Sequence, residues 1–544
     1  MRELKWILIG SGIAIVLWIL LTAFHFQIDG LIDKGKELLS DDKEEKILVM
    51  GRANSSLGLD PAVLTDHDSF KVTVNIYDNL VRYDDNSSKI VPSLAESWNI
   101  SENGLIWQFK IRKNVFFHDG SPLNAKAIAF NFTRWMDESS PYHTGYFTYW
   151  NMSFGGFPGI VEQVTALSDE VLEIRLKEPY SPFLNILTMP AFGIASPDAI
   201  MTFNENLKQH PVGSGPFVFQ SWRDDDTIVL ERNDNYWGEK AKVDKVMFKT
   251  IANKEERLRA LKSGKIHVVD LLTKNEIEKL EEDRNISLIS RPYFNIGYLS
   301  MNMNKDYFKL REVRRAVGHL FDRDKMMTEA FDELAKSANS FLPPVIWGHN
   351  ETIKALDYDV YKAKKMLQSV GLSDGFELEL LVMDLPRKYF PRPIALAEYI
   401  KSSLSKANIE VKLSIVPWAE VIKRRNKGDY DMVLAGWNGD IFDPDNFLYT
   451  IFASENLKQG VSRNYSYYRD SQVDILLNQA RQATDRDFRA NLYRTLQELI
   501  HEDTPAIPLV HTMTFIGVRK NVIGYIPSIS GQEVLNKVYI ENGE

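Results

Sequence analysis

The chain of 544 residues contains no cysteine. Disulfides, thiolate metal sites and thiol catalysis are therefore excluded, and so is attachment of a lipid to a cysteine near the N-terminus. Stability, ligand binding and any membrane attachment must come from other residue types.

The sequence also lacks an excess of positive charge. Its 65 lysines and arginines are outnumbered by 74 aspartates and glutamates, which gives a net charge of −9 and a pI near 5.7. A protein that binds nucleic acid needs a basic face to meet the phosphates. We therefore expect no nucleic-acid partner.

Sequence patterns of catalysis are missing as well. None of the motifs G-x-S-x-G, H-E-x-x-H, G-x-G-x-x-G and S-x-x-K stands in a suitable context. The ten histidines are scattered, and none form a pair spaced for one helical turn, so a zinc site is not indicated. The many carboxylates leave a glycosidase pair open. We expect a binding protein with no cofactor and no metal, and keep an extracellular hydrolase as the alternative from another class.

What is present is the composition of a globular protein. Hydrophobic residues make up 44% and charged residues 26%, and the length exceeds that of a single core, so two or three lobes are expected. The chain is rich in aromatic residues, with 11 Trp, 22 Tyr and 29 Phe. Large enclosed ligand sites use aromatic walls, although most aromatic side chains belong to the core.

The N-terminal segment sets the expected location. Residues 6–24 (WILIGSGIAIVLWILLTAF) carry no charge, follow Arg2 and Lys5, and are long enough to cross a bilayer. Residues 1–26 are therefore interpreted as a membrane anchor or a cleaved signal segment, and the charged residues 27–46 as a linker. Under both interpretations the rest of the chain lies outside the membrane, in an extracellular or periplasmic setting.

The remaining chain alternates β-rich runs with amphipathic stretches, which predicts a mixed α/β fold. Strands are expected at 46–51, 71–77, 105–111, 171–176, 227–231, 245–251 and 376–382. Helices are expected at 124–138, 254–263, 274–282, 311–318, 360–369, 395–406, 471–483 and 486–502. In the first of these helices, Asn124 is the expected N-cap, and the buried side is expected to carry Ala127, Ile128, Phe130, Phe132 and Trp135.

Several segments carry a family resemblance. Residues 92–136 read PSLAESWNISENGLIWQFKIRKNVFFHDGSPLNAKAIAFNFTRWM, residues 301–326 read MNMNKDYFKLREVRRAVGHLFDRDKM, and residues 436–448 read GWNGDIFDPDNFL. These stretches, with 212–222, 230–251 and 358–367, resemble the family 5 extracellular solute-binding proteins, which are the peptide- and nickel-binding subunits of ABC importers. The matches occur in order and cover about 47–540.

The resemblance implies a two-lobed α/β fold of the flytrap type, with an extra inserted domain, preceded here by an N-terminal transmembrane helix. On that pattern, residues 47–84, 208–290 and 514–544 form lobe I, residues 85–207 form the inserted domain II, and residues 291–513 form lobe III. The lobes are expected to close on the ligand about a hinge. The family pattern also implies a monomer.

The motif G-W-x-G-D at 436–440 is intact in this sequence. In dipeptide binders of the family, the aspartate of this motif holds the α-amino group of the peptide, which makes Asp440 the expected amine ligand. Gly436 belongs to the same motif, and Trp437 is expected either in the wall of the cleft or in the core. Because Asp443 and Asp445 follow closely, a simply solvated acidic loop is the alternative.

The segment MDLPRKYFPRP at 383–393 resembles the family loop that carries an arginine before an aromatic-x-Pro. Arg387 is then the expected ligand of the peptide α-carboxylate, in the two-pronged geometry that suits a guanidinium. Tyr389 follows in the same loop, and Trp418 resembles a position near the pocket. A surface cluster with Lys388 and Arg392 is the alternative for Arg387.

The expected function is therefore the extracellular substrate-binding component of an ABC importer, which binds short peptides and delivers them to permease subunits. Binding of a nickel or other metal chelate by the same scaffold stays open, and so does a sensor that signals without transport. The missing cysteine departs from the lipid-anchored members of the family. The helix predicted at 6–24 would then tether the protein to the membrane.

Overall fold

The computed structural model describes residues 45–85, 87–332, 334–457 and 462–541. The predicted membrane segment 6–24 lies outside these residues, as does the predicted linker 27–46 apart from its last two residues. Within the described ranges, no helix has both the length and the apolar character needed to cross a bilayer. Residues Ile47–Glu544 form one compact unit.

A seven-stranded mixed sheet gathers strands from three distant parts of the chain, in the order β10-β11-β12-β1-β13-β21-β14. Its strands are β1 (Ile47–Arg52), β10 (Phe217–Trp222), β11 (Thr227–Arg232), β12 (Lys245–Thr250), β13 (Val268–Val269), β14 (Ile286–Arg291) and β21 (Thr514–Arg519). Helices α7 (Lys254–Ser263) and α8 (Lys274–Glu281) pack against it and bury Leu261 and Leu280.

A four-stranded antiparallel sheet is formed from one continuous stretch of chain, in the order β4-β5-β9-β8. Its strands are β4 (Ala95–Ile100), β5 (Ile106–Ile111), β8 (Val161–Ala166) and β9 (Val171–Leu176). Helix α3 (Ala125–Met136) packs on this sheet, and the Asn124 side chain accepts hydrogen bonds from the first-turn amides, as expected of an N-cap. Ile128, Phe132 and Trp135 are buried as predicted, and Phe130 is half-buried.

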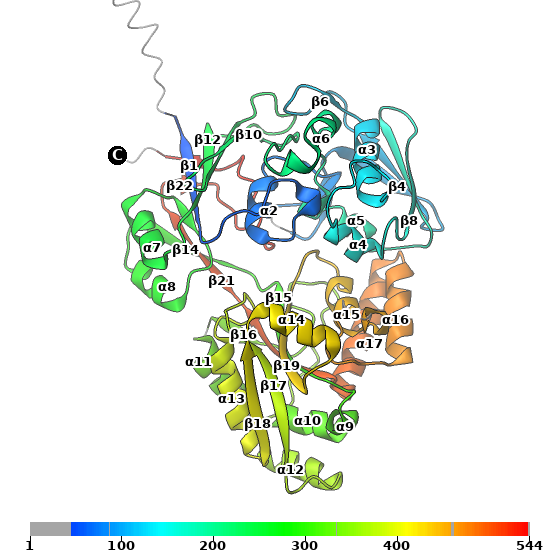
Figure 1. The fold of residues 1–544 in the computed structure, drawn as a ribbon, viewed down its shortest axis with the longest axis vertical. Helices are drawn as coiled ribbons and strands as arrows, with labels where there is room; N and C mark the ends of the chain where they lie inside the picture. The colour runs from blue at the N-terminus through cyan, green and yellow to red at the C-terminus, as the bar shows by residue number, and fades with distance from the viewer. Residues whose placement is uncertain (1–44, 86, 333, 458–461, 542–544) are drawn as a thin grey trace, which may run out of the picture. The chain divides into compact units, whose positions relative to one another are not determined.

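A six-stranded sheet has the order β16-β20-β15-β19-β17-β18. Its strands are β15 (Asn295–Met301), β16 (Ala335–Ser337), β17 (Phe376–Met383), β18 (Ile409–Val416), β19 (Met432–Asn438) and β20 (Ala506–Thr512). Helix α13 (Pro393–Ser405) lies along β17 and β18 (Figure 1). The other helices of this region are α9 (Asp306–Lys309), α10 (Arg311–His319), α11 (Arg323–Phe331), α12 (Val360–Ser369), α14 (Trp418–Lys427), α15 (Asp445–Phe452), α16 (Ser471–Gln482) and α17 (Arg486–Asp503).

Short elements complete the described chain. The remaining helices are η1 (Pro61–Val63), α2 (His67–Thr73), α4 (Thr148–Phe154), α5 (Phe183–Ile186), η2 (Pro190–Phe192), α6 (Pro197–Phe203), η3 (Asn204–Lys208) and η4 (Ser454–Leu457). The remaining strands pair as β2 (Val81–Tyr83) with β3 (Ile90–Pro92), β6 (Val115–Phe116) with β7 (Pro122–Leu123), and β22 (Val522–Ile523) with β23 (Tyr539–Ile540).

The chain passes directly between the seven-stranded and six-stranded sheets at two places. β14 leads into β15, and β20 leads into β21. The two passages are tied together where Asn295 and Thr512 face each other: the Thr512 amide donates to Asn295 Oδ1 over 2.9 Å, and Asn295 Nδ2 donates to the Thr512 carbonyl over 2.9 Å. Two adjacent crossings of this kind are where a hinge between the two sheets is expected.

One predicted strand is wrong. The alternating run at 71–77 was expected to be extended, but His67–Thr73 form helix α2. Asp66 caps the helix by accepting a hydrogen bond from the Ser69 amide, and Phe70 and Val72 are buried. Local capping and burial of one helical face therefore override the β propensity of the valines and threonine.

Candidate functional site

Arg387 lies in the loop between β17 and α13. The loop turns tightly there, because the amide and carbonyl of Arg387 exchange hydrogen bonds with Phe390 over 3.0 and 2.9 Å. The guanidinium carbon of Arg387 lies 4.0 Å from the centre of the Trp418 ring, at the start of α14. In the part of the chain that the structure describes, no carboxylate lies within ion-pair distance of Arg387. The structure thus brings two predicted site residues together and leaves one positive charge unneutralised.

The two basic neighbours of Arg387 have different surroundings from it. Arg392 is paired with Asp332 at 2.5 Å. Lys388 turns toward the seven-stranded sheet, where burial, opposed in part by the charge of Asp270, lowers its pKa to about 8. The Lys388 carbonyl accepts a hydrogen bond of 2.6 Å from Thr512 Oγ1. The backbone next to Arg387 is therefore bound directly to the crossing strand β20.

Tyr389 and Gly436 are also in contact, but as a packed pair. Tyr389 is buried, and burial raises the pKa of its hydroxyl to about 12. A Cβ atom added to Gly436 on β19 would lie only 2.3 Å from Tyr389 Cδ2. Only glycine lets the tyrosine ring lie on the strand at this point. The pair fixes the Arg387 loop against the strand that carries the G-W-x-G-D motif.

The motif itself is organised by the side chain of Asn446. Asn446 Oδ1 accepts hydrogen bonds from the indole nitrogen of Trp437 over 3.1 Å and from the Asp440 amide over 2.9 Å. Trp437 is half-buried at the end of β19. The neighbouring acidic residues have structural partners: Asp443 pairs with Arg489 at 2.8 Å, and Asp445 pairs with Arg481 at 3.2 Å.

Asp440 differs from these neighbours. Within the described residues, no cation lies within ion-pair distance of its carboxylate, and Tyr149 donates a long hydrogen bond of 3.4 Å to Oδ1. Burial raises the pKa of Asp440 to about 6, although the hydrogen bonding of Asn446 and the charge of Arg463 oppose the shift. A half-buried carboxylate without a counterion is suited to hold a cationic group of a ligand.

Residues from the four-stranded-sheet region lie against this loop. The Phe442 amide donates to the Tyr83 hydroxyl over 3.0 Å, and Asn185 Nδ2 donates to Asp443 Oδ2 over 3.4 Å. With the Tyr149 contact to Asp440, these bonds connect segments more than 250 residues apart in sequence. The Asp440 loop is therefore held against segments that lie far from it in the sequence.

Three residues near the predicted site were missed by the sequence reasoning. Arg425 lies on α14 with its guanidinium carbon 4.8 Å from the Trp418 ring centre and 4.1 Å from that of Tyr465. It follows Trp418 by two helical turns, so the spacing in the sequence predicts that both residues lie on the same face of the helix. Arg463 lies 6.0 Å from the Trp437 ring centre, and burial lowers its pKa. No sequence pattern singles out Arg463 or Tyr465.

A large groove lies next to Arg463, whose charge acts on Asp440. Its volume is about 1230 Å³, and Arg463, Tyr180, Tyr449 and Arg481 contribute to its lining. The groove runs between segments 146–160 and 177–180 on one side and residues of 449–482 on the other. It offers more space than a dipeptide needs, because small-ligand sites usually enclose about 300–1,000 Å³.

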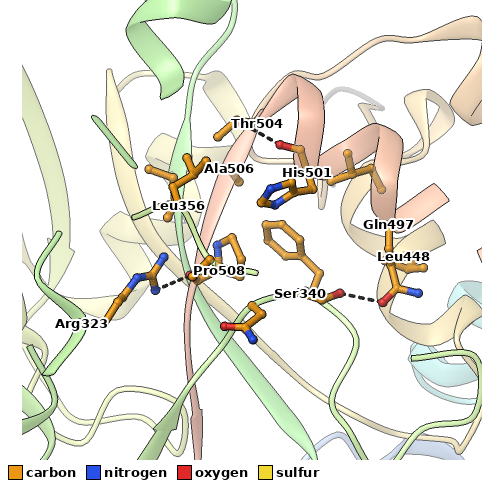
Figure 2. A pocket seen from close by; sticks show the side chains of 14 residues that line it. Arg323, Ser340, Leu356, Leu448, Gln497, His501, Thr504, Ala506 and Pro508 are labelled. Atoms are coloured by element: carbon orange, nitrogen blue, oxygen red, sulfur yellow. Dashed lines mark hydrogen bonds between the residues drawn. The ribbon is translucent and has the colours of Figure 1, made fainter. Parts of the chain in front are cut away.

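A second cavity is too small to hold such a ligand. It lies beside β20 and α17 and has a volume of about 20 Å³, which is enough for a single water molecule. Figure 2 shows Ser340 hydrogen-bonded to Gln497 and Arg323 to the carbonyl of Pro508 around it. None of the six predicted site residues lines this cavity. In the described ranges, no group of three or more histidines and carboxylates is arranged to hold a metal ion.

Comparison with known proteins agrees with this architecture. The dipeptide-binding protein of Escherichia coli is 31% identical over 513 residues, which cover 92% of this chain and 95% of that protein. Heme-binding protein A of Haemophilus influenzae is 30% identical and covers 90% of this chain and 91% of its own. An ABC transporter-associated periplasmic binding protein of Helicobacter pylori, solved with the peptide STSA, is 33% identical, with a TM-score of 0.78 and coverage of 92% and 99%.

The sequence model for the middle part of the family described as "Bacterial extracellular solute-binding proteins, family 5" matches residues 89–459. The family consists of solute-binding proteins, so the expectation of a binding protein in place of an enzyme is confirmed, as is the two-lobed α/β fold. The finer expectation of a transmembrane helix at 6–24 falls outside the described residues. This chain belongs to the bacterial extracellular solute-binding proteins, family 5.

Proposed function

We propose that this protein captures short peptides outside the cell membrane and delivers them to the permease of an ABC importer. The observation that supports the proposal is a pair of opposite charges without ion-pair partners, on two segments that meet where Tyr389 packs on Gly436. Asp440 offers a carboxylate without a cation, and Arg387 offers a guanidinium without a carboxylate, among the residues that the structure describes. A free peptide carries the two complementary charges at its ends.

Once the site closes on a ligand, each of these two charges requires a counterion. A buried ion without a partner is costly, and removing one partner of a buried pair typically costs about 3–5 kcal/mol. The peptide ammonium would neutralise Asp440, and its α-carboxylate would receive two parallel hydrogen bonds from Arg387. Trp418 and Trp437 would supply apolar walls between these two contacts. Charges held at a fixed separation would also select the length of the peptide.

Closure of the cleft would use the two chain crossings at Asn295 and Thr512. In this proposal lobe I comprises residues 47–84, 208–290 and 514–544, domain II comprises 85–207, and lobe III comprises 291–513. Arg387 and Asp440 both belong to lobe III, so a peptide would first bind there and then be covered by the other two parts. Hinge closure of this kind expels water and strengthens each charge contact.

The predicted helix at 6–24 would keep the binding protein close to its permease. This proposal rests on the uncharged run, the preceding positive charges and the missing cysteine. Membrane fractionation of the full chain, compared with a variant that lacks residues 1–26, tests it. Membrane association of the full chain alone is expected, whereas release of both proteins into the soluble fraction would contradict the anchor.

Calorimetry with end-blocked peptides tests the binding function. Ala-Ala is expected to bind, while N-acetyl-Ala-Ala and Ala-Ala-amide should each bind at least 30-fold more weakly, because each lacks one terminal charge. Asp440→Asn and Arg387→Ala should weaken binding of Ala-Ala by about 2–4 kcal/mol. A nickel–histidine chelate serves as the competing ligand. Equal binding of free and blocked peptides, or binding of the chelate alone, would refute the proposal.

A further inference from the structure

Arg425 is a buried cation with no visible counterion. Its side chain is only 7% exposed, and its Nε atom is fully buried without a hydrogen-bond partner. The guanidinium is stacked near the rings of Trp418 and Tyr465, at 4.8 and 4.1 Å from their centres. Stacking satisfies the faces of a guanidinium, but its five N–H groups point outward from the edge and need acceptors.

Other buried arginines of the described chain show what is missing. Each of the following is held by a carboxylate: Arg134 by Asp60, Arg291 by Glu533, Arg314 by Asp503, and Arg489 by Asp443. The neighbouring Arg424 on the same helix is held by Glu379 at 2.7 Å and by Asp429 at 3.2 Å. Arg52 and Arg257 are buried without a carboxylate partner, but their N–H groups donate to hydroxyl and carbonyl oxygens. For the Arg425 side chain, neither kind of partner is present among the described residues.

Arg425 lies near Arg387, the residue proposed to bind the α-carboxylate of the peptide. Arg387 and Arg425 both approach Trp418, at 4.0 and 4.8 Å from the ring centre, so their guanidinium carbons lie no farther apart than the sum of these two distances. Both arginines also influence the hydroxyl of Tyr389, whose pKa their charges lower against the larger effect of burial. Arg425 and Arg387 therefore both lie against the Trp418 side chain, which keeps their guanidinium groups near each other.

One α-carboxylate cannot neutralise both guanidinium groups. A zwitterionic peptide with neutral side chains would bring one carboxylate to Arg387 and leave Arg425 buried without an anion. An aspartate or glutamate at the carboxyl end of the peptide would supply a second carboxylate next to the first. Arg463, near Asp440, adds a further positive charge, so the site as a whole favours a ligand with net negative charge.

We infer that the preferred ligands are short peptides whose carboxyl-terminal residue is acidic, with Arg425 as the residue that selects the acidic side chain. This inference rests on the proposed peptide-binding function and adds the substrate class. A charge-assisted hydrogen bond to a desolvated guanidinium discriminates strongly against a neutral isostere, because the isostere leaves the buried charge unpaired.

Calorimetry on the full chain with isosteric dipeptides tests the inference. Ala-Glu is expected to bind at least tenfold more tightly than Ala-Gln. Arg425→Met keeps the apolar stem and removes the charge. The affinities of this variant for Ala-Glu and Ala-Gln should therefore differ by no more than threefold. Arg425→Lys should retain part of the preference. The matched control is Arg424→Met on the adjacent, fully paired arginine, which should keep the tenfold preference.

The position of the acidic residue is tested with Asp-Ala and Asn-Ala, whose preference ratio should be smaller than that of Ala-Glu over Ala-Gln. Equal binding of Ala-Glu and Ala-Gln by the unmodified protein would overturn the inference, whether or not any variant folds. A preference that survives in Arg425→Met would also overturn it. Failure of every dipeptide to bind would instead refute the proposed function, so the two failures are distinguishable.

Discussion

At the scale of single residues, the proposed site is distinguished by charges that the fold leaves without partners. Asp443 and Asp445 lie close to Asp440 in sequence, yet both have arginine partners. Asp440 has none among the described residues, and burial raises its pKa to about 6. The same contrast separates Arg425 from Arg424 on α14. A partnerless charge inside a protein is unfavourable for stability and therefore points to ligand binding.

The raised pKa of Asp440 predicts a pH dependence of peptide binding. A cationic amine binds the ionised carboxylate, which predominates above the pKa of about 6 in the unliganded protein. Affinity for Ala-Ala should be constant above about pH 7 and fall as the pH drops through 6, by up to tenfold per further pH unit. Calorimetry between pH 5 and pH 8 measures this profile.

The control for this profile is Asp440→Asn, which should bind weakly with little change across the same range. It is needed because burial also raises the pKa of Asp445 to about 6. The raised pKa has the opposite consequence for the empty protein: the ionised form of Asp440 destabilises the fold above pH 6, and protonation relieves this as the pH falls. A flat binding profile in the unmodified protein would contradict the assignment of Asp440.

At the scale of elements, sequence periodicity predicts well where one face is buried and a cap is present. The helix 254–263 matches α7, and 360–369 matches α12, because apolar spacing and Asn or Asp caps agree in both. The run at 71–77 fails because its valines occur on a capped helix. The resemblance of motifs predicts six site residues. The hydrogen bonds from Trp437 and Asp440 to Asn446 could not be predicted in this way, because they depend on the folded shape of the loop.

The contact between β19 and the Arg387 loop predicts that substitutions of Gly436 and Tyr389 have non-additive effects on the free energy of unfolding. Gly436→Ala should destabilise the protein by about 1–3 kcal/mol, since the added Cβ would lie 2.3 Å from the Tyr389 ring and overpack the contact. Urea denaturation measures the loss. In a Tyr389→Ala background the same substitution should cost less than half as much, as a double-mutant cycle would show. Additive losses would exclude direct contact between the two residues.

At the scale of the whole molecule, the two crossings connect the proposed hinge to the proposed ligand site. Asn295 and Thr512 are 217 residues apart in sequence, so no local pattern could predict their pairing. Thr512 Oγ1 donates to the Lys388 carbonyl over 2.6 Å, and Lys388 directly follows Arg387. A change in the angle between the crossing strands would therefore be transmitted to the loop that carries the proposed carboxylate ligand.

Removing this hydroxyl tests the link. Thr512→Val keeps the shape of the side chain but deletes the hydroxyl, which lies 2.6 Å from the Lys388 carbonyl and 3.0 Å from Asn295 Oδ1. The loss should cost about 1–2 kcal/mol of stability. The loosened loop should also weaken binding of Ala-Ala several-fold, with a smaller loss for Ala-Ala-amide, because that peptide lacks the carboxylate that Arg387 would hold. Calorimetry and urea denaturation measure the two effects.

The matched control is Thr514→Val, two residues further along the same crossing. Thr514 is half-buried at the start of β21, and in the described part of the structure its hydroxyl makes no hydrogen bond. Both the stability and the peptide affinity of this variant should stay close to those of the unmodified protein. If Thr512→Val lowers stability but leaves the ratio of the Ala-Ala and Ala-Ala-amide affinities unchanged, the hydroxyl supports the fold alone, and the hinge is not coupled to Arg387 through this bond.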